Sequence, residues 1–166
     1  ELKENTLNML NNNKITNNVF QHQLPFNIIP HIDEFQDNNY TKEEMKVILE
    51  IKKIFNDQKI NISCTAVRVP TIRAHAMSVT IETNKKTNIN CIKNILDNSE
   101  GITLMDDIKN NIYPMPINSS NKYNVNVGRI RKNEIFGENG FDLFICGDQI
   151  LKGSALNAVQ IAEKMI

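Results

Sequence analysis

The order in which strand-like and helix-like stretches follow one another limits the fold of this chain more than any other feature of its sequence. Seven stretches carry a regular apolar pattern, four typical of strands at residues 60–69, 76–83, 125–131 and 141–147, and three typical of helices at residues 41–55, 87–98 and 153–166. They do not alternate as the regular β–α–β units of a parallel sheet do. The sequence therefore predicts an α+β fold, with a mixed, largely antiparallel sheet covered by helices.

The predicted helices and hairpin carry more detailed expectations. Thr41 is a good N-cap, and Glu44 three residues later completes the pattern of a capping box. The turn signal at 138–140 is expected to join the last two strands. Apolar residues at helical spacing in the three predicted helices are expected to face the core, namely Met45, Ile48, Ile51, Phe55, Ile89, Ile92, Ile95, Leu96, Leu156, Val159 and Ala162.

The balance of charge argues against two classes of partner. The chain has 19 Lys and Arg residues against 19 Asp and Glu residues, and a formal net charge of zero. Nucleic-acid binding and anionic-membrane binding usually need a basic excess, so neither is expected. No apolar run approaches the roughly 18 residues of a membrane span. The length of 166 residues suits one domain, and no linker divides it.

The cysteines argue against a metal site. Cys64, Cys91 and Cys146 lie far apart, and no Cys/His pair has the spacing of zinc ligands, so no metal is expected. A sparse, odd number of cysteines is typical of reduced thiols in a cytoplasmic protein. Cys64 and Cys146 are interpreted as small hydrophobic core residues, and no cysteine has the local signature of an activated nucleophile.

The most unusual local feature is the stretch from Arg68 to His75, in which a predicted strand delivers an arginine, Pro70 forces a turn and a histidine follows. An arginine can bind a carboxylate or phosphate through two parallel hydrogen bonds. A histidine can exchange protons near neutral pH. The spacing alone leaves open the alternative of a surface arginine and an unrelated loop histidine.

Two further places are candidates for ligand contact. Glu43 and Lys46 are three residues apart on the first predicted helix and could point at one ligand, although a solvated ion pair explains the same pattern. Gln149, in the Gly147–Gln149 junction between a strand and a helix, lies where ligand contacts are common, and where a polar helix entry is equally ordinary. The sequence has no GxGxxG motif and no P-loop.

Several of these segments, in order, resemble motifs of the bacterial-type aspartate-semialdehyde dehydrogenases. The similarity extends from about Val19 to Ile166. The matching segments are Pro25–Asp33, Tyr40–Lys46, Arg68–Pro70 with His75, Tyr113–Pro116, Val127–Arg131, Gly147–Gln149 and Lys152–Glu163.

The resemblance implies a reaction and a role for five residues. The family reduces β-aspartyl phosphate with NADPH to aspartate semialdehyde and phosphate, in the biosynthesis of lysine, threonine and methionine. His75 matches the family's acid/base histidine, and Arg68 its substrate-carboxylate ligand. Glu43 matches the glutamate that meets the substrate amino group, Lys46 a lysine that helps to bind phosphate, and Gln149 a residue that touches the cofactor.

The family's enzymes are about twice as long as this chain. Their first half carries the glycine-rich NADP site and the catalytic cysteine, neither of which is recognisable here. Residues 1–166 are therefore expected to be the C-terminal catalytic and dimerisation domain, with a fold like the C-terminal domain of glyceraldehyde-phosphate dehydrogenase. The NADP-binding domain is expected to be absent, the isolated chain inactive, the parent enzyme a cytoplasmic homodimer, and the apolar face of the last helix partly exposed.

Two alternatives to this interpretation remain open. The chain could serve as a non-catalytic oligomerisation or binding module derived from the family, or it could belong to a reductase of a related acyl phosphate. The sequence also departs from the family at Ala74, where a glycine is common, and at Ala76, where a serine is common. Neither change affects one of the five candidate site residues.

Overall fold

The contacts within the chain fall into two units. The structure, a computed structural model, describes residues Glu1–Ile166. The first unit comprises Glu1–Pro70 and the second Thr71–Ile166. No glycine-rich linker marks this division in the sequence. The division falls after Pro70, within the matching motif formed by Arg68–Pro70 and His75.

The N-terminal unit contains two helices, α1 (Leu2–Leu10) and α2 (Lys42–Ile54), joined by extended chain. The predicted capping box at the start of α2 is confirmed. The Thr41 hydroxyl accepts a hydrogen bond from the Glu44 amide at 3.3 Å, and the Thr41 amide donates to the Glu44 carboxylate at 2.7 Å. Both side chains are buried. The local sequence thus determines where α2 begins.

The expectation that four apolar residues of α2 face the core is wrong for Phe55 and only partly met for the other three. Glu44 is the only buried residue of the helix, and Phe55, its C-cap, is 67% exposed. Met45, Ile48 and Ile51 are half-buried. Helical spacing shows which side chains share a face, but it does not show how completely that face is covered.

Residues 60–69, predicted to form a strand, belong to no sheet. Arg68 makes an isolated bridge with Ile29, through Ile29 N to Arg68 O at 3.0 Å and Arg68 N to Ile29 O at 2.8 Å. Ala66 N donates instead to the Glu44 carboxylate, at 2.8 Å. The alternating pattern correctly indicated extended chain, but its hydrogen-bond partner is a helix side chain, which periodicity cannot reveal.

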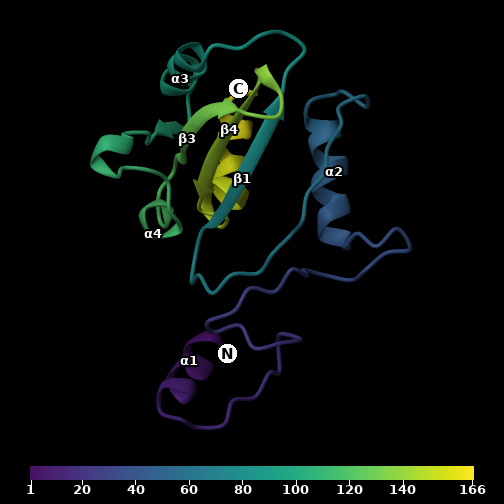
Figure 1. The fold of residues 1–166 in the computed structure, drawn as a ribbon, viewed down its shortest axis with the longest axis vertical. Coiled ribbons are helices and arrows are strands. Elements are labelled where there is room, and N and C mark those ends of the chain that lie inside the picture. The colour runs from purple at the N-terminus through teal and green to yellow at the C-terminus, as the bar shows by residue number, and fades with distance from the viewer. The chain divides into compact units, whose positions relative to one another are not determined.

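The C-terminal unit is built on a four-stranded mixed sheet in the order β1–β4–β3–β2 (Figure 1). Its strands are β1 (His75–Glu82), β2 (Ile102–Leu104), β3 (Val125–Asn133) and β4 (Gly137–Gly147). β4 runs antiparallel to both β1 and β3, and β2 runs parallel to β3. The predicted α+β class and largely antiparallel sheet are confirmed.

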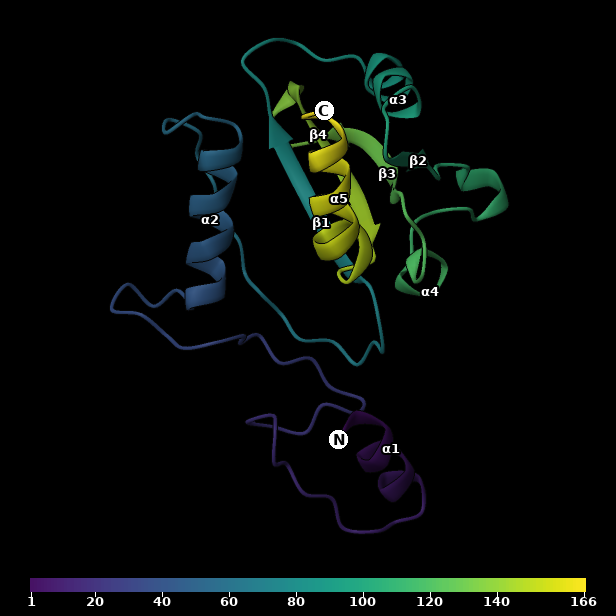
Figure 2. The same cartoon turned by 180° about the vertical axis from the view of Figure 1, so that it is seen from behind.

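Helices surround this sheet. Figure 2 shows α5 passing in front of β1 and β4 in that view. The helices are α3 (Ile89–Asp97), the short α4 (Pro116–Ser119) and α5 (Leu156–Glu163), with a 3-10 turn at Ile108–Asn110 and a π-helical segment at Leu151–Ala155 directly before α5. No helix of the structure is long and apolar enough to cross a lipid bilayer.

The core lies between one face of the sheet and α3. Four buried residues form it, namely Val127, Ile130, Phe141 and Leu143. Ile89, Ile92 and Leu96 of α3 pack against this cluster, as the helical spacing predicted, whereas Ile95 is 59% exposed.

The turn between β3 and β4 lies earlier in the chain than predicted. The strands are joined at residues 134–136, and Gly140 is inside β4, where it pairs with Glu82. The Asn133 side chain builds the turn by accepting hydrogen bonds from Ile135 N at 2.9 Å and Phe136 N at 3.0 Å. An asparagine bonding to backbone two and three residues ahead outcompetes the later turn signal.

The last helix is more exposed than its pattern suggested. Leu156 is half-buried, but Val159 is 55% exposed and Ala162 is also exposed. Burial was therefore predicted wrongly for Val159 and Ala162 and is partial for Leu156. Their exposure agrees with the expectation that this face of α5 is left partly uncovered.

Gly128 is required by a close approach of two backbone segments. A Cβ atom at this position would lie 2.0 Å from the carbonyl oxygen of Met105 and 2.7 Å from Cδ of Pro114. Since real Cβ atoms do not come this close to backbone, any side chain would force β3 away from the 105–114 segment.

We expect Gly128→Ala to lower the free energy of unfolding by about 2–4 kcal/mol, because the added methyl group overpacks a backbone contact. Urea unfolding measures the change. Gly153→Ala is the matched control, since its Cβ would sit 3.6 Å from the Asp148 carbonyl oxygen, an ordinary contact. Equal losses in the two variants would contradict the prediction.

Candidate functional site

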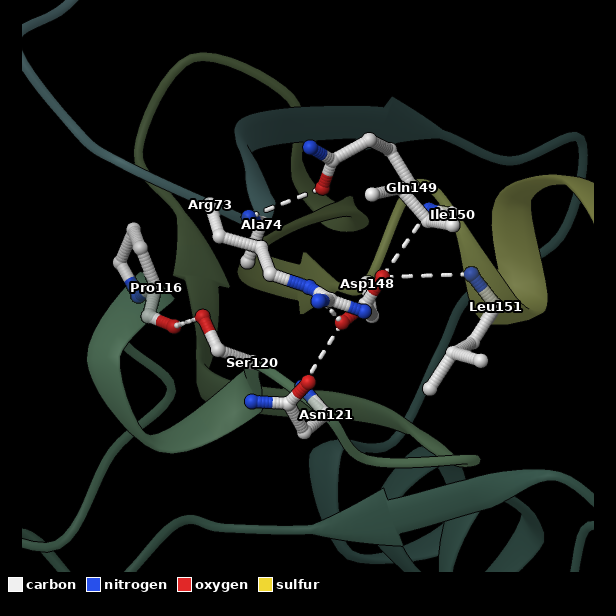
Figure 3. Close-up of polar contacts among 9 residues, drawn as sticks. All are labelled: Arg73, Ala74, Pro116, Ser120, Asn121, Asp148, Gln149, Ile150 and Leu151. Atoms are coloured by element: carbon white, nitrogen blue, oxygen red, sulfur yellow. Dashed lines mark hydrogen bonds and ion pairs between the residues drawn. The ribbon is translucent and has the colours of Figure 1, made fainter.

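The start of β1 and the end of β4 bring two distant segments of the chain together. His75 and Gly147 are direct partners in the antiparallel register. Arg73 and Ala74 therefore lie beside residues 148–149, although the two segments are 75 positions apart in sequence (Figure 3). This junction carries two of the five predicted site residues, His75 and Gln149.

Asp148 is the polar centre of this junction. Its carboxylate accepts hydrogen bonds from four donors: Arg73 Nε at 2.6 Å, Asn121 N at 2.7 Å, Ile150 N at 2.9 Å and Leu151 N at 3.2 Å. The Asp148 side chain is fully buried, and that of Arg73 is 31% exposed. The Arg73 guanidinium, followed by the three backbone amides, holds the pKa of Asp148 far below its ordinary value.

Gln149 also holds the segment before β1. Its Oε1 accepts a hydrogen bond from Ala74 N at 2.9 Å, and Figure 3 shows its amide nitrogen directed away from that contact. Ala74 is buried and has a φ of +72°, in the left-handed region that non-glycine residues rarely adopt. The residue immediately before His75 is thus held in an unusual conformation by the side chain of Gln149.

His75 itself is the first residue of β1, and its side chain is exposed. Its backbone is fixed by pairing with Gly147, while its imidazole stays accessible to a ligand. An accessible histidine on a rigid strand end has the placement that a general acid/base needs.

Glu43 and Lys46 lie together on the first turns of α2. Lys46 Nζ is 3.8 Å from Glu43 Oε2, and their side chains are 56% and 36% exposed, respectively. Such a long, exposed contact contributes little to stability. Both charges are therefore available to a ligand, in contrast to Glu44, whose carboxylate is occupied by the capping box and Ala66.

Arg68 is held by its backbone and by an aromatic ring. Both backbone polar groups bond to Ile29, and the guanidinium carbon lies 5.0 Å from the centroid of the Phe20 ring. Arginine stacked in this way keeps its hydrogen-bonding edge free. Arg68, Glu43 and Lys46 belong to the N-terminal unit, and His75 and Gln149 to the other, so their convergence on one pocket stays a prediction.

A hollow of about 320 Å³ in the N-terminal unit contains none of the predicted site residues. It opens near the start of α2, where Tyr40, Glu44 and Cys64 contribute to its lining. The Tyr40 hydroxyl lies 3.2 Å from that of Ser63 across this hollow.

All three cysteines are free. Burial raises the pKa of the Cys64 thiol, and the charges of Glu44 and Glu43 raise it further. Burial also raises the pKa of Cys146, which has no exposed surface. Neither thiol therefore has the lowered pKa that is typical of a reactive cysteine. No cluster of three or more His, Cys, Asp or Glu side chains is placed to hold a metal ion.

Arg73 and Asp148 are the important residues that the sequence reasoning missed. Arg73 stood inside the noted stretch from Arg68 to His75, and Asp148 inside the Gly147–Gln149 junction, but neither was assigned a role. Their nearness in sequence to the candidates His75 and Gln149 is the one feature of the sequence that could have pointed to them.

Comparison with known proteins identifies the family. Residues 1–152 match the family described as semialdehyde dehydrogenase, dimerisation domain, and the chain belongs to that family. The aspartate-semialdehyde dehydrogenase of Prochlorococcus marinus is 42% identical over 166 residues, which are 100% of this chain and 48% of that protein. The chain thus spans about half the length of the curated relatives it matches.

Solved structures agree. The crystal structure of aspartate semialdehyde dehydrogenase II from Vibrio cholerae, complexed with ASA, superposes with a TM-score of 0.92 at 39% identity, covering 98% of this chain and 47% of that one. The structure of the Candida albicans aspartate semialdehyde dehydrogenase with NADP shares the fold, at a TM-score of 0.61 and 20% identity, over 76% of this chain and 40% of that one.

The lowered pKa of the buried Asp148 predicts a specific response of the protein to acid. Because the pKa of Asp148 is lowered in the folded state, its contribution to stability is complete above the unfolded pKa of about 4 and is lost as the pH falls below it. We expect the urea midpoint to fall between about pH 5 and pH 2 more steeply for the parent chain than for Asp148→Asn, which cannot titrate.

The control for this measurement is Asp97→Asn, at an exposed carboxylate near the end of α3. It should follow the pH profile of the parent chain. An Asp148→Asn profile as steep as that of the parent would show that this carboxylate does not link proton binding to folding.

Proposed function

We propose that residues 1–166 are the C-terminal catalytic and dimerisation domain of an aspartate-semialdehyde dehydrogenase, and that they supply its acid/base group and substrate ligands. The reaction converts β-aspartyl phosphate, NADPH and a proton to aspartate semialdehyde, phosphate and NADP⁺. The family match and the full-length alignment with the Prochlorococcus relative support this proposal. The observation that carries it is an accessible His75 on a backbone fixed on both sides.

His75 would be the acid/base group. A neutral imidazole accepts the proton released when a nucleophile adds to the semialdehyde carbon, and returns it when the reaction runs toward reduction. The nucleophilic thiol itself is expected outside this chain, because none of Cys64, Cys91 and Cys146 lies in the sequence context of the family's catalytic cysteine. Burial also raises the pKa of Cys64 and Cys146.

The charged residues of the N-terminal unit match the charges of the substrate. Aspartyl phosphate carries a carboxylate, an ammonium group and a phosphate. Arg68 would bind the carboxylate through two hydrogen bonds, Glu43 the ammonium group, and Lys46 the phosphate. The weak contact between Glu43 and Lys46 supports these roles, since little is lost when each turns to a ligand.

One side chain, that of Gln149, is available to contact NADP. The Gln149 amide nitrogen makes no hydrogen bond in the structure, and the side chain is half-buried, so it can donate to the nicotinamide carboxamide. NADP, when bound, exchanges a hydride with the substrate carbon. Residues 1–166 contain no glycine-rich phosphate loop. Most contacts with NADP would therefore come from a domain outside this chain.

The parent enzyme is proposed to be a cytoplasmic homodimer acting in the aspartate-family pathway to lysine, threonine and methionine. Three free thiols are those expected in a reducing compartment. The exposed apolar face of α5 also favours a second candidate, a non-catalytic oligomerisation module. The two differ in whether His75 is needed for any activity.

We expect the chain alone to show no NADP-dependent oxidation of aspartate semialdehyde with phosphate, and activity to appear when it is joined to the half of the Prochlorococcus relative that it does not match. In the joined enzyme, His75→Gln should lower kcat by about 10²–10⁴-fold. His22→Gln, at another exposed histidine, is the control. Turnover by the chain alone, or full activity of His75→Gln, would refute the proposal.

In the same joined enzyme, Arg68→Lys should raise the KM for aspartate semialdehyde by about 10–100-fold, since lysine keeps the charge but loses the paired hydrogen bonds. Arg129→Lys, at an exposed arginine of β3, should leave KM near the parent value. An unchanged KM in Arg68→Lys would remove Arg68 from the binding site.

A further inference from the structure

The backbone leading into His75 needs support from outside its own segment. Ala74 has a φ of +72° and is 4% exposed. Left-handed backbone is unfavourable for alanine, because Cβ crowds the following carbonyl oxygen. Nothing in the local sequence offsets this strain, since the preceding residues form bends rather than a helix or strand.

The support comes from Asp148 and Gln149, two consecutive residues that directly follow β4. Asp148 accepts from the Arg73 guanidinium at 2.6 Å, and Gln149 accepts from Ala74 N at 2.9 Å. His75 then pairs with Gly147. Three successive residues before and at the start of β1 are thus each held by one of three successive residues at and just after the end of β4, as Figure 3 shows for the first two.

Asp148 is itself held rigidly. The backbone amides of Asn121, Ile150 and Leu151 all donate to its carboxylate, and its side chain has no exposed surface. A group fixed by three amides and one guanidinium cannot rotate without breaking several charge-assisted hydrogen bonds. It therefore provides a stable anchor for Arg73.

We propose that Arg73, Asp148 and Gln149 are positioning residues for His75. Together with Ala74 they form what we call the 73/149 clamp, which holds the backbone before the histidine and so fixes the direction of its imidazole. The catalytic consequence of the clamp rests on the proposed function, whereas its effect on local order does not.

The clamp assigns the two ends of the Gln149 amide to different tasks. Oε1 is occupied by Ala74 N, while Nε2 is left free. A residue that served the cofactor alone would act through Nε2 and would have no effect on the histidine. Variants that remove one end of the amide at a time can therefore separate the two tasks.

The first measurement is amide hydrogen exchange on the chain as it stands. Gln149→Met, which removes the acceptor, should lower the protection of the Ala74 amide by at least about tenfold. Gln149→Glu keeps an acceptor oxygen and should retain that protection. Gln160→Met is the matched control, since Gln160 accepts from Lys152 Nζ and does not touch the clamp. Equal protection in all variants would overturn the clamp.

The second measurement is kinetic and uses the joined enzyme. Gln149→Met should lower kcat by about tenfold or more, because a displaced base is poorly aligned. Adding Ala74→Gly should restore part of that kcat, because glycine adopts the left-handed conformation without support. Gln149→Glu should instead raise the KM for NADP. A kcat loss that Ala74→Gly does not relieve would show that Gln149 serves the cofactor only, and would overturn the positioning role.

The two parts of the test fail differently. If the joined enzyme has no activity with any variant, the proposed function fails and the exchange data still decide whether the clamp exists. If the joined enzyme is active but the exchange and rescue results are negative, the proposed function stands and the positioning role is refuted.

Discussion

The buried carboxylate of Asp148 is the interaction on which the candidate site depends. It joins three segments from different parts of the sequence: the bend before β1, the residues after α4, and the turn that enters the π-helical segment. A buried charge is tolerated only when its hydrogen-bonding capacity is filled, and here four donors fill it. The sheet brings these donors together, because the antiparallel register of β1 and β4 places residue 75 opposite residue 147.

Neighbouring carboxylates in α2 show how burial decides whether a carboxylate is available to a ligand. Glu44 is buried, accepts from Thr41 and Ala66, and fixes the start of the helix, and these hydrogen bonds lower its pKa. Glu43, one residue earlier, is partly exposed and makes only a long contact with Lys46. The same residue type thus stabilises the fold at one position and remains available for binding at the next.

The sequence predicted those features that depend on near neighbours. The capping box at Thr41, the extent of α3 and the position of β1 all follow from patterns among residues close together in sequence. Features set by distant partners were missed. Residues 60–69 look like a strand but bond to a helix side chain, Asn133 moves the hairpin turn, and the contacts of Asp148 depend on a register that no local pattern reveals.

The left-handed backbone at Ala74 also has a consequence for how the protein is made. During synthesis, residue 75 leaves the ribosome long before residue 149. The histidine is nevertheless oriented only when β4 has paired with β1 and Gln149 has bonded to Ala74. Chains interrupted anywhere in between would carry every atom of the imidazole without its orientation. The orientation of the His75 imidazole is therefore gained only after β4 has paired with β1, and it is lost when that pairing is lost.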